Sequence, residues 1–273
     1  MQGSLPDSPA FASGLGWERH LDHEGRVCAY TRAADGNGWL RVPGLACFRF
    51  PTDDGYIEAR AEADASADRI RDTYYRIALP LALQAAGHEV LHASAVSDAR
   101  GVHVFCGASR SGKSTLAYAL GRRGFEMWAD DAVAFNVDGR GIAAVPLPFV
   151  LRLREEVAEF FDVPTRIGQS DGKTEMLRHQ ASGPREIASV SLLERGRSST
   201  IAPVSAQESL PAVLYHSFYF SLDDPSIVRR MGTQFLELVA EVPVFRVSMR
   251  PGLDALAEML DALEQRLLTP AAA

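Results

Sequence analysis

Lysine is almost absent from this chain of 273 residues. Of its 28 basic residues only Lys113 and Lys173 are lysines, and the others are arginines. Where arginine has replaced lysine nearly everywhere, a lysine that remains indicates a position that a compact ammonium fits and a planar guanidinium does not. Lys113 lies in a glycine-containing motif, at a position that a compact ammonium fits. Lys173 lies in a polar segment, residues 169–174, whose composition predicts a loop. It is either a second phosphate or substrate contact or an ordinary surface lysine.

The chain also lacks a long hydrophobic run, a surplus of positive charge and a set of paired cysteines. No segment is apolar for long enough to span a membrane, and the first residues show neither the charged nor the apolar region of a signal peptide. The three cysteines, Cys28, Cys47 and Cys106, are odd in number and far apart, which favours reduced thiols in a cytoplasmic protein. A net charge of −7 disfavours a nucleic-acid partner and suits a peptide or small-protein partner. Homo-oligomerisation is left open.

The strongest motif is G-x-x-x-x-G-K-[ST], the phosphate-binding loop of nucleotide-using proteins. An apolar run at residues 102–106 precedes it and predicts a buried strand, and residues 115–123 follow with helical spacing. Backbone N–H groups of such a loop converge on phosphates, beside a lysine that we expect to be exposed. The alternative is an ordinary glycine turn. The expected ATP-binding residues are Gly107, Ala108, Ser109, Arg110, Ser111, Gly112, Lys113, Ser114 and Thr115.

Two adjacent carboxylates, Asp130 and Asp131, lie inside an apolar segment, residues 125–135, that predicts a buried strand. Burying them is costly unless a cation compensates their charge, and a Mg²⁺ held by Ser114 and Asp130 would do so. Because successive strand side chains point to opposite faces, two neighbours can serve one site only where the strand ends and the chain bends. We therefore expect a bend at this pair, and the alternative is a solvated turn.

Strands alternate with helices along most of the chain, which favours an α/β fold. Residues 1–65 predict a small β-rich N-terminal segment, and residues 66–273 predict the larger second domain. The expected strands are 26–32, 39–43, 47–50, 90–96, 102–106, 125–135, 187–193 and 242–249. The expected helices are 66–87 with a kink at Pro80, 115–123, 154–161, 206–217, 224–241 and 253–268.

Three motifs, in the order 91–96, 107–115 and 123–133, closely resemble the kinase domain of bacterial HPr kinase/phosphorylase. That family has a histidine on the strand before the loop, then the phosphate loop, then an Arg-Gly segment that leads to Ala-Asp-Asp-x-Val. The resemblance implies a P-loop kinase core of the HPr kinase/phosphoenolpyruvate carboxykinase type, with ATP and Mg²⁺ as cofactors.

The resemblance also implies the role of each matching residue. Lys113 would bind the β/γ-phosphates, and Ser114 and Asp130 would hold Mg²⁺. Asp131 would take the proton from the substrate hydroxyl as general base, and His92 would lie near Asp131 or the transferring phosphate. Arg110 occupies a loop position where the family commonly has glycine, so it either contacts phosphate or faces solvent.

The chain departs from full-length HPr kinase in two ways. The family's E-I-R-G-L-G signature has no match, and residues 150–156 stand roughly in its place. The large N-terminal domain is replaced by the β-rich segment. This short form looks more like the HPr-kinase-like proteins of peptide natural-product gene clusters, which include kinases of the C-terminal serine of lasso-peptide precursors.

The function predicted is therefore an ATP-dependent serine kinase acting on a peptide or protein. The alternatives are an HPr(Ser) kinase-type regulatory kinase, a nucleotide-binding regulatory module without turnover, and a small-molecule kinase. Arg229, Arg230 and Arg246 could supply a late phosphate-binding arginine, and the sequence does not choose between them.

Overall fold

The computed structural model divides the chain into two compact units, Met1–His88 with Tyr219–Pro225, and Glu89–Phe218 with Ser226–Ala273. The residues that the structure describes are 18–21, 27–32, 37–50, 56–139, 141–163, 169–170, 173–178, 183–218 and 225–268.

The first unit is an antiparallel sheet covered by a helical segment. Its strands follow the chain order as β1 (Glu18–Leu21), β2 (Val27–Arg32), β3 (Gly38–Val42), β4 (Ala46–Phe50) and β5 (Glu58–Ala61). The helical segment consists of α1 (Ala67–Thr73), the π-helix η1 (Tyr74–Ala78) and α2 (Leu79–Ala85). Leu40 and Phe48 of the sheet pack with Ile77 and Leu81 of the helices in one buried cluster. The strands expected at 26–32, 39–43 and 47–50 are confirmed.

The unit boundary differs from the one predicted between residues 65 and 66. The structure places it after His88, because the apolar face of the helical segment is buried against β3 and β4. The expected distortion near Pro80 takes the form of the π-helix just before it, where Leu79 donates its backbone N–H to Tyr74 O. A wide turn of this kind is one way for a helix to accommodate a proline, which has no N–H to donate.

The second unit contains a nine-stranded mixed sheet, which is the core of the α/β fold. At its centre β15 runs parallel to β8 on one side and to β17 on the other. Parallel strands are buried on both faces, and every residue of β8 is buried. The strands are β6 (Glu89–Leu91), β7 (Ala93–Asp98), β8 (Gly101–Gly107), β9 (Glu126–Ala129), β10 (Val133–Asp138), β11 (Gly141–Val145), β15 (Arg185–Arg195), β16 (Thr200–Pro203) and β17 (Val244–Met249).

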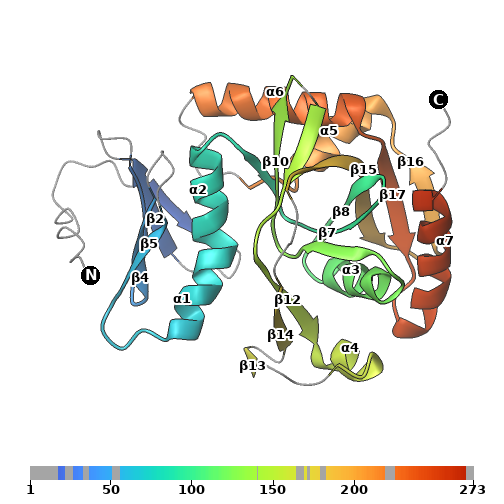
Figure 1. Ribbon diagram of the computed structural model, residues 1–273, viewed down its shortest axis with the longest axis horizontal. Coiled ribbons are helices and arrows are strands. Elements are labelled where there is room, and N and C mark those ends of the chain that lie inside the picture. Colours follow the sequence, from blue (N-terminus) through green and yellow to red (C-terminus); the bar gives the residue numbers. More distant parts are fainter. Residues whose placement is uncertain are drawn as a thin grey trace. The chain divides into compact units, whose positions relative to one another are not determined.

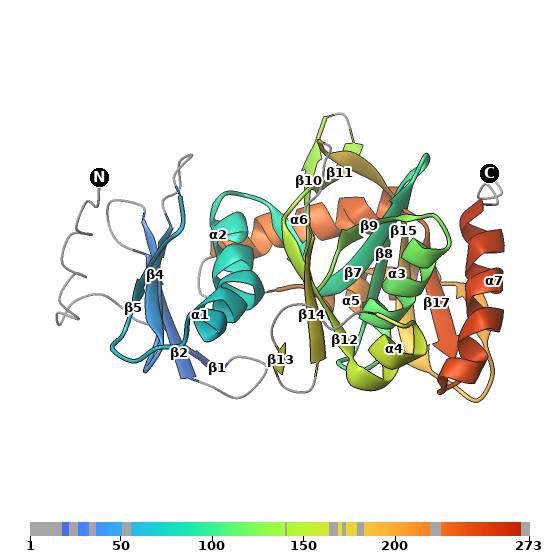
Figure 2. The same ribbon diagram turned by 60° about the horizontal axis from the view of Figure 1, so that its bottom comes forward.

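Helices cover both faces of this sheet, as Figures 1 and 2 show. On one face α3 (Lys113–Arg122) and α7 (Leu256–Leu268) share a buried cluster with Phe105 and Val247. On the other face α5 (Ala206–Leu214) and α6 (Pro225–Glu241) bury Val213, Phe235 and Leu238 against Val104. The 3₁₀ turn η2 (Leu253–Ala255) leads into α7. The expected helix at 224–241 is confirmed within one residue. The expected helix at 253–268 is confirmed with its first three residues in the 3₁₀ turn, and α5 ends three residues before its predicted end.

A small second sheet packs beside α3 in the same unit. It has the order β12 (Phe149–Arg154), β14 (Lys173–Arg178), β13 (Gln169–Ser170), and α4 (Glu155–Phe160) follows β12 directly. Leu151 and Leu153 of β12 pack with Tyr118 of α3 and Val157 of α4. Lys173, expected in a loop, begins β14 opposite Arg154. Within the described part of the chain, no helix has the length and apolar character needed to cross a membrane.

Candidate active site

The phosphate-loop motif lies where its pattern predicts, between the end of β8 at Gly107 and the start of α3 at Lys113. Gly112 has a φ of 103°, and a Cβ there would stand 3.0 Å from Met249 Cε. A Cβ on Gly107 would come within 2.6 Å of Ser111 Oγ and 2.8 Å of Leu193 O. Close approach to Leu193 O therefore requires glycine at 107, and the left-handed φ requires it at 112, where the loop crosses the carboxyl ends of β8, β15 and β17.

Arg110 occupies a left-handed position in this loop, with φ of 66°. A side chain in this region is strained by about 1 kcal/mol, which explains why glycine is the usual choice there. Arg195, the last residue of β15, donates from Nη2 to Arg110 O at 2.9 Å and so braces the turn. The side chain of Arg110 is exposed.

Lys113 points back into the loop and is not exposed as expected, since only 7 % of the residue is accessible. Its ammonium donates to Gly107 O at 2.8 Å and to Ala108 O at 3.3 Å, and it lies 3.4 Å from His92 Nε2. A buried ammonium needs acceptors, and the loop's own carbonyls supply them. The lysine is thereby held inside the concave side of the loop, where a phosphate would take over these contacts.

The carboxylate pair lies at a break in a long antiparallel ribbon. Two segments that were each expected to be one strand, 90–96 and 125–135, are interrupted in the middle: β6 and β7 flank His92, and β9 and β10 flank residues 130–132. Val133 pairs with Leu91 before the break and Ala129 pairs with Ala95 after it, so the register is the same on both sides. The predicted bend is confirmed, and Asp131 forms it with a left-handed φ of 65°.

This register explains the first contact of Asp130. When the same pairing register is continued across the break, Ser94 lies opposite Asp130. Ser94 Oγ donates a hydrogen bond to Asp130 Oδ1 at 2.6 Å. Oδ2 accepts the backbone N–H of Arg152 at 3.2 Å, and the Ser114 hydroxyl also donates to this carboxylate. Asp130 is 4 % exposed. Burial in the first place, and then the negative charge of Asp131, raise the pKa of Asp130 to about 6.

Asp131 is held from two sides. Its carboxylate Oδ2 accepts a hydrogen bond from Nη1 of Arg152 at 3.0 Å, and its backbone carbonyl accepts one from Nδ1 of His92 at 3.1 Å. Because a carbonyl can only accept, the proton of the neutral imidazole is on Nδ1, and Nε2 offers its lone pair to Lys113. His92 therefore joins the carboxylate bend to the phosphate loop, as the sequence resemblance suggests. The Asp131 side chain keeps 26 % exposure, so that a substrate can reach it.

Three residues at this site were not predicted: Arg152, Ser94 and His216. His216 O accepts the backbone N–H of His92 at 2.7 Å, which fixes the break in the ribbon. Burial, and then the positive charge of Lys113, lower the pKa of His216 to about 4, so that its ring is neutral at pH 7. The neighbouring Cys106 is unreactive, because full burial raises the pKa of its thiol to about 12.

The arginine candidates do not gather at the phosphate loop. Arg230 pairs through Nε with the buried Glu89 at 3.2 Å, and Arg246 pairs with Glu194 at 3.5 Å. No contact in the described part of the chain connects Arg229 to the loop. Arg195 reaches the loop instead, through its contact with the Arg110 carbonyl. The side chain of Lys173 lies outside the described residues.

The residues fit a magnesium–nucleotide phosphate in two respects. The Ser111 hydroxyl is buried in the loop without a hydrogen-bond partner, which marks a donor that a phosphate oxygen could use. Ser114 and Asp130 offer a hydroxyl and a carboxylate oxygen side by side, the hard ligands that Mg²⁺ prefers together with substrate phosphates. A cation there would also relieve the unfavourable burial of Asp130. Among the described residues no group of three or more His, Cys, Asp or Glu forms an all-protein metal cage.

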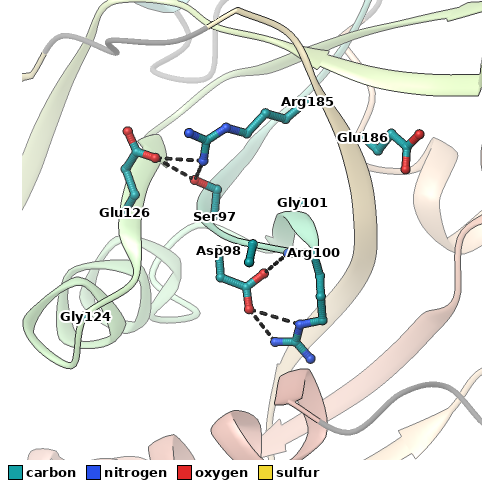
Figure 3. Close-up of a pocket in the computed structure, with 9 residues that line it drawn as sticks. Ser97, Asp98, Arg100, Gly101, Gly124, Glu126, Arg185 and Glu186 are labelled. Carbon is teal, nitrogen blue, oxygen red and sulfur yellow. Dashed lines mark hydrogen bonds and ion pairs between the residues drawn. The ribbon is translucent and has the colours of Figure 1, made fainter.

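A pocket of about 590 Å³ lies at the other end of β8, beside Gly101 (Figure 3). Two pairs of its charged groups contact each other: Arg185 lies 2.8 Å from Glu126, and the Arg100 guanidinium donates to the Asp98 carboxylate. Gly101 at the pocket and Gly107 at the phosphate loop are the two ends of β8, about 20 Å apart along the strand. The pocket therefore plays no part in the site built around Lys113.

Comparison with solved structures finds likenesses, one of which is to an HPr(Ser) kinase/phosphatase. The structure of the HPr(Ser) kinase/phosphatase from Coxiella burnetii aligns with 66 % of this chain and 90 % of its own, at 14 % sequence identity and a TM-score of 0.35. No protein-family model matches the sequence, and no curated protein matches it. At this TM-score the likeness decides nothing about function, which rests on the residues of the site.

Proposed function

We propose that the protein is an ATP- and Mg²⁺-dependent kinase that transfers the γ-phosphoryl group to a serine hydroxyl of a peptide or small protein. One observation carries the proposal. The lysine of a phosphate loop, a carboxylate in contact with the loop's serine, and a second, accessible carboxylate meet at the break in one ribbon. Phosphoryl transfer needs positioning and charge neutralisation more than covalent chemistry, and this set supplies both.

Each residue has one task in this reaction. Lys113 turns from its loop carbonyls to the β/γ-phosphates, and Ser111 donates to a phosphate oxygen. Ser114 and Asp130 would hold Mg²⁺, which neutralises charge on the phosphate oxygens when it is bound. The bond from the acceptor oxygen to the γ-phosphorus forms as the bond to the β,γ-bridging oxygen breaks, and ADP leaves. Asp131 takes the proton of the acceptor hydroxyl.

The acceptor we favour is the C-terminal serine of a lasso-peptide precursor. This choice is supported by the resemblance of residues 91–133 to HPr-kinase-like proteins combined with the missing E-I-R-G-L-G signature. The net charge of −7 suits a neutral or basic peptide. HPr is the acceptor to compare with it, since HPr kinases share the same three motifs.

The test incubates the protein with ATP, Mg²⁺ and one acceptor at a time, followed by tandem mass spectrometry. The acceptors are a precursor peptide ending in serine, the same peptide ending in alanine, and HPr. We expect one phosphoryl group on the terminal serine of the first peptide only. Transfer to HPr alone would show that the acceptor is a phosphocarrier protein and not a precursor peptide. If Mg²⁺–ATP binds but no acceptor is modified, the proposal is wrong, and a regulatory nucleotide site and a small-molecule kinase remain as the alternatives.

A further inference from the structure

Arg152 is a buried basic residue in the middle of an apolar strand. It lies on β12 between Leu151 and Leu153, which both point into the cluster with α4. Because strand side chains alternate, Arg152 points to the opposite face, toward the carboxylate pair. Its side chain is only 7 % exposed. A buried guanidinium is costly unless it has a charged partner, so the strand holds it there for a specific contact.

Arg152 touches both carboxylates with different atoms. Its backbone N–H donates to Asp130 Oδ2 at 3.2 Å, and its Nη1 donates to Asp131 Oδ2 at 3.0 Å. Only the second contact belongs to the side chain. A substitution at Arg152 therefore releases Asp131 while it leaves the backbone contact of Asp130 in place.

Asp131 needs such a contact more than a residue in a regular strand would. Its φ of 65° places it outside the pleat, so the strand geometry does not direct its carboxylate. Its backbone is anchored through His92, but the carboxylate itself is 26 % exposed, next to a second negative charge on Asp130. A fixed cation on one carboxylate oxygen sets the direction in which the other oxygen faces.

We infer that Arg152 is a positioning residue of the transfer reaction, which orients the Asp131 carboxylate toward the acceptor hydroxyl. This inference rests on the proposed function. The buried ion pair suits this role, because Arg152 is fixed on a strand and its Nη1 contacts the carboxylate of the residue that takes the proton. Misplacing a catalytic group by about 1 Å is enough to slow a reaction on the order of 10²-fold.

The experiment compares Arg152→Met, Arg152→Lys and Asp131→Asn with the double variant, and measures kcat, the KM for ATP and calorimetric affinity for Mg²⁺–ATP. The matched control is Arg154→Met, which removes an exposed arginine two residues along the same strand, paired with Glu156 at 3.5 Å. We expect Arg152→Met to lower kcat about 10²-fold with nucleotide affinity unchanged, and Arg152→Lys to recover part of the loss. Arg154→Met should behave as the wild type.

The double variant decides whether Arg152 acts through Asp131. If it does, Arg152→Met combined with Asp131→Asn should be no slower than Asp131→Asn alone. Two losses that multiply, or a loss of nucleotide affinity in Arg152→Met, would overturn the inference. Should Arg152→Met not fold, Arg152→Lys in the same cycle gives the same comparison. Wild-type protein without any transfer would contradict the proposed function itself, and the inference with it; normal wild-type transfer with an unchanged Arg152→Met contradicts the inference alone.

Discussion

Asp130→Asn should make the metal-free protein more stable while it removes magnesium-dependent nucleotide binding. The buried carboxylate carries a raised pKa, from the usual 3.8 to about 6, because burial and Asp131 disfavour its charge. An asparagine keeps the contact with the Arg152 N–H through its carbonyl, and its amide donates to Ser94 Oγ, which reverses the hydrogen bond of the wild type. The substitution removes an unfavourable buried charge, and we expect this gain to exceed the cost of reorienting the Ser94 and Ser114 hydroxyls, which donate to the carboxylate in the wild type.

The size and pH dependence of this effect follow from the pKa. The folded protein keeps the Asp130 proton to a higher pH than the unfolded chain does. The contribution of this group to the free energy of unfolding therefore falls as the pH rises from 3.8 to about 6. A shift of about two units at 1.36 kcal/mol each sets an upper bound of about 3 kcal/mol at pH 7. Below about pH 4 the wild-type carboxyl is protonated and the two proteins should be nearly equal.

The assay is urea unfolding of wild type and Asp130→Asn in EDTA, across this pH range. We expect the difference in unfolding free energy to be near zero at the acid end and to favour the variant at neutral pH. Added Mg²⁺–ATP should stabilise the wild type and leave the variant unchanged. A variant less stable than wild type at pH 7 in EDTA would show that Asp130 is not held as an uncompensated charge, and would refute the reasoning.

Three further results are expected. Lys113→Met should abolish transfer, and should cost about 1–3 kcal/mol of stability because the Gly107 and Ala108 carbonyls lose their donor; a folded variant with normal turnover would remove the loop from the mechanism. Asp131→Asn should bind Mg²⁺–ATP normally and slow transfer by about 10²–10⁴-fold, and equal losses of binding in the Asp130 and Asp131 variants would disprove their different roles. His216, whose pKa is lowered from 6.5 to about 4, stabilises the fold in its neutral form and loses this contribution as pH falls from 6.5 to about 4. Its ring resonances should not titrate above about pH 5 in NMR spectra, and a midpoint near 6.5 would contradict its burial beside Lys113.

The phosphate loop and the bend at the carboxylates could be predicted because each depends on local chemistry. The glycines of the motif, Gly107 and Gly112, let the backbone approach a phosphate, and their spacing is visible in the sequence alone. Adjacent Asp130 and Asp131 in an apolar segment are incompatible with a continuous buried strand, so a bend was required there. The orientation of Lys113 was not predictable, since the loop's own carbonyls compete with phosphate for the ammonium, and only the folded loop shows their proximity.

The site residues that were not predicted reach the site through strand pairing and tertiary contacts, which the spacing of residues along the sequence does not show. Ser94 meets Asp130 because of the register across the broken ribbon, and His216 arrives from the end of α5. Arg152 did carry a signal, an arginine inside an apolar strand, which is the same anomaly that identified the carboxylates. The helix at 67–85 was assigned to the wrong unit because an amphipathic face indicates burial without saying which sheet covers it.

The most direct test of the central claim is a crystal structure of the protein with Mg²⁺ and a non-hydrolysable ATP analogue. The account predicts the β- and γ-phosphates inside residues 107–114, with Lys113 turned onto them and Mg²⁺ between Ser114 and Asp130. The γ-phosphate should face the Asp131 carboxylate, which stays paired with Arg152. An analogue bound elsewhere, or a Lys113 that remains on the Gly107 carbonyl beside an empty loop, would contradict the account.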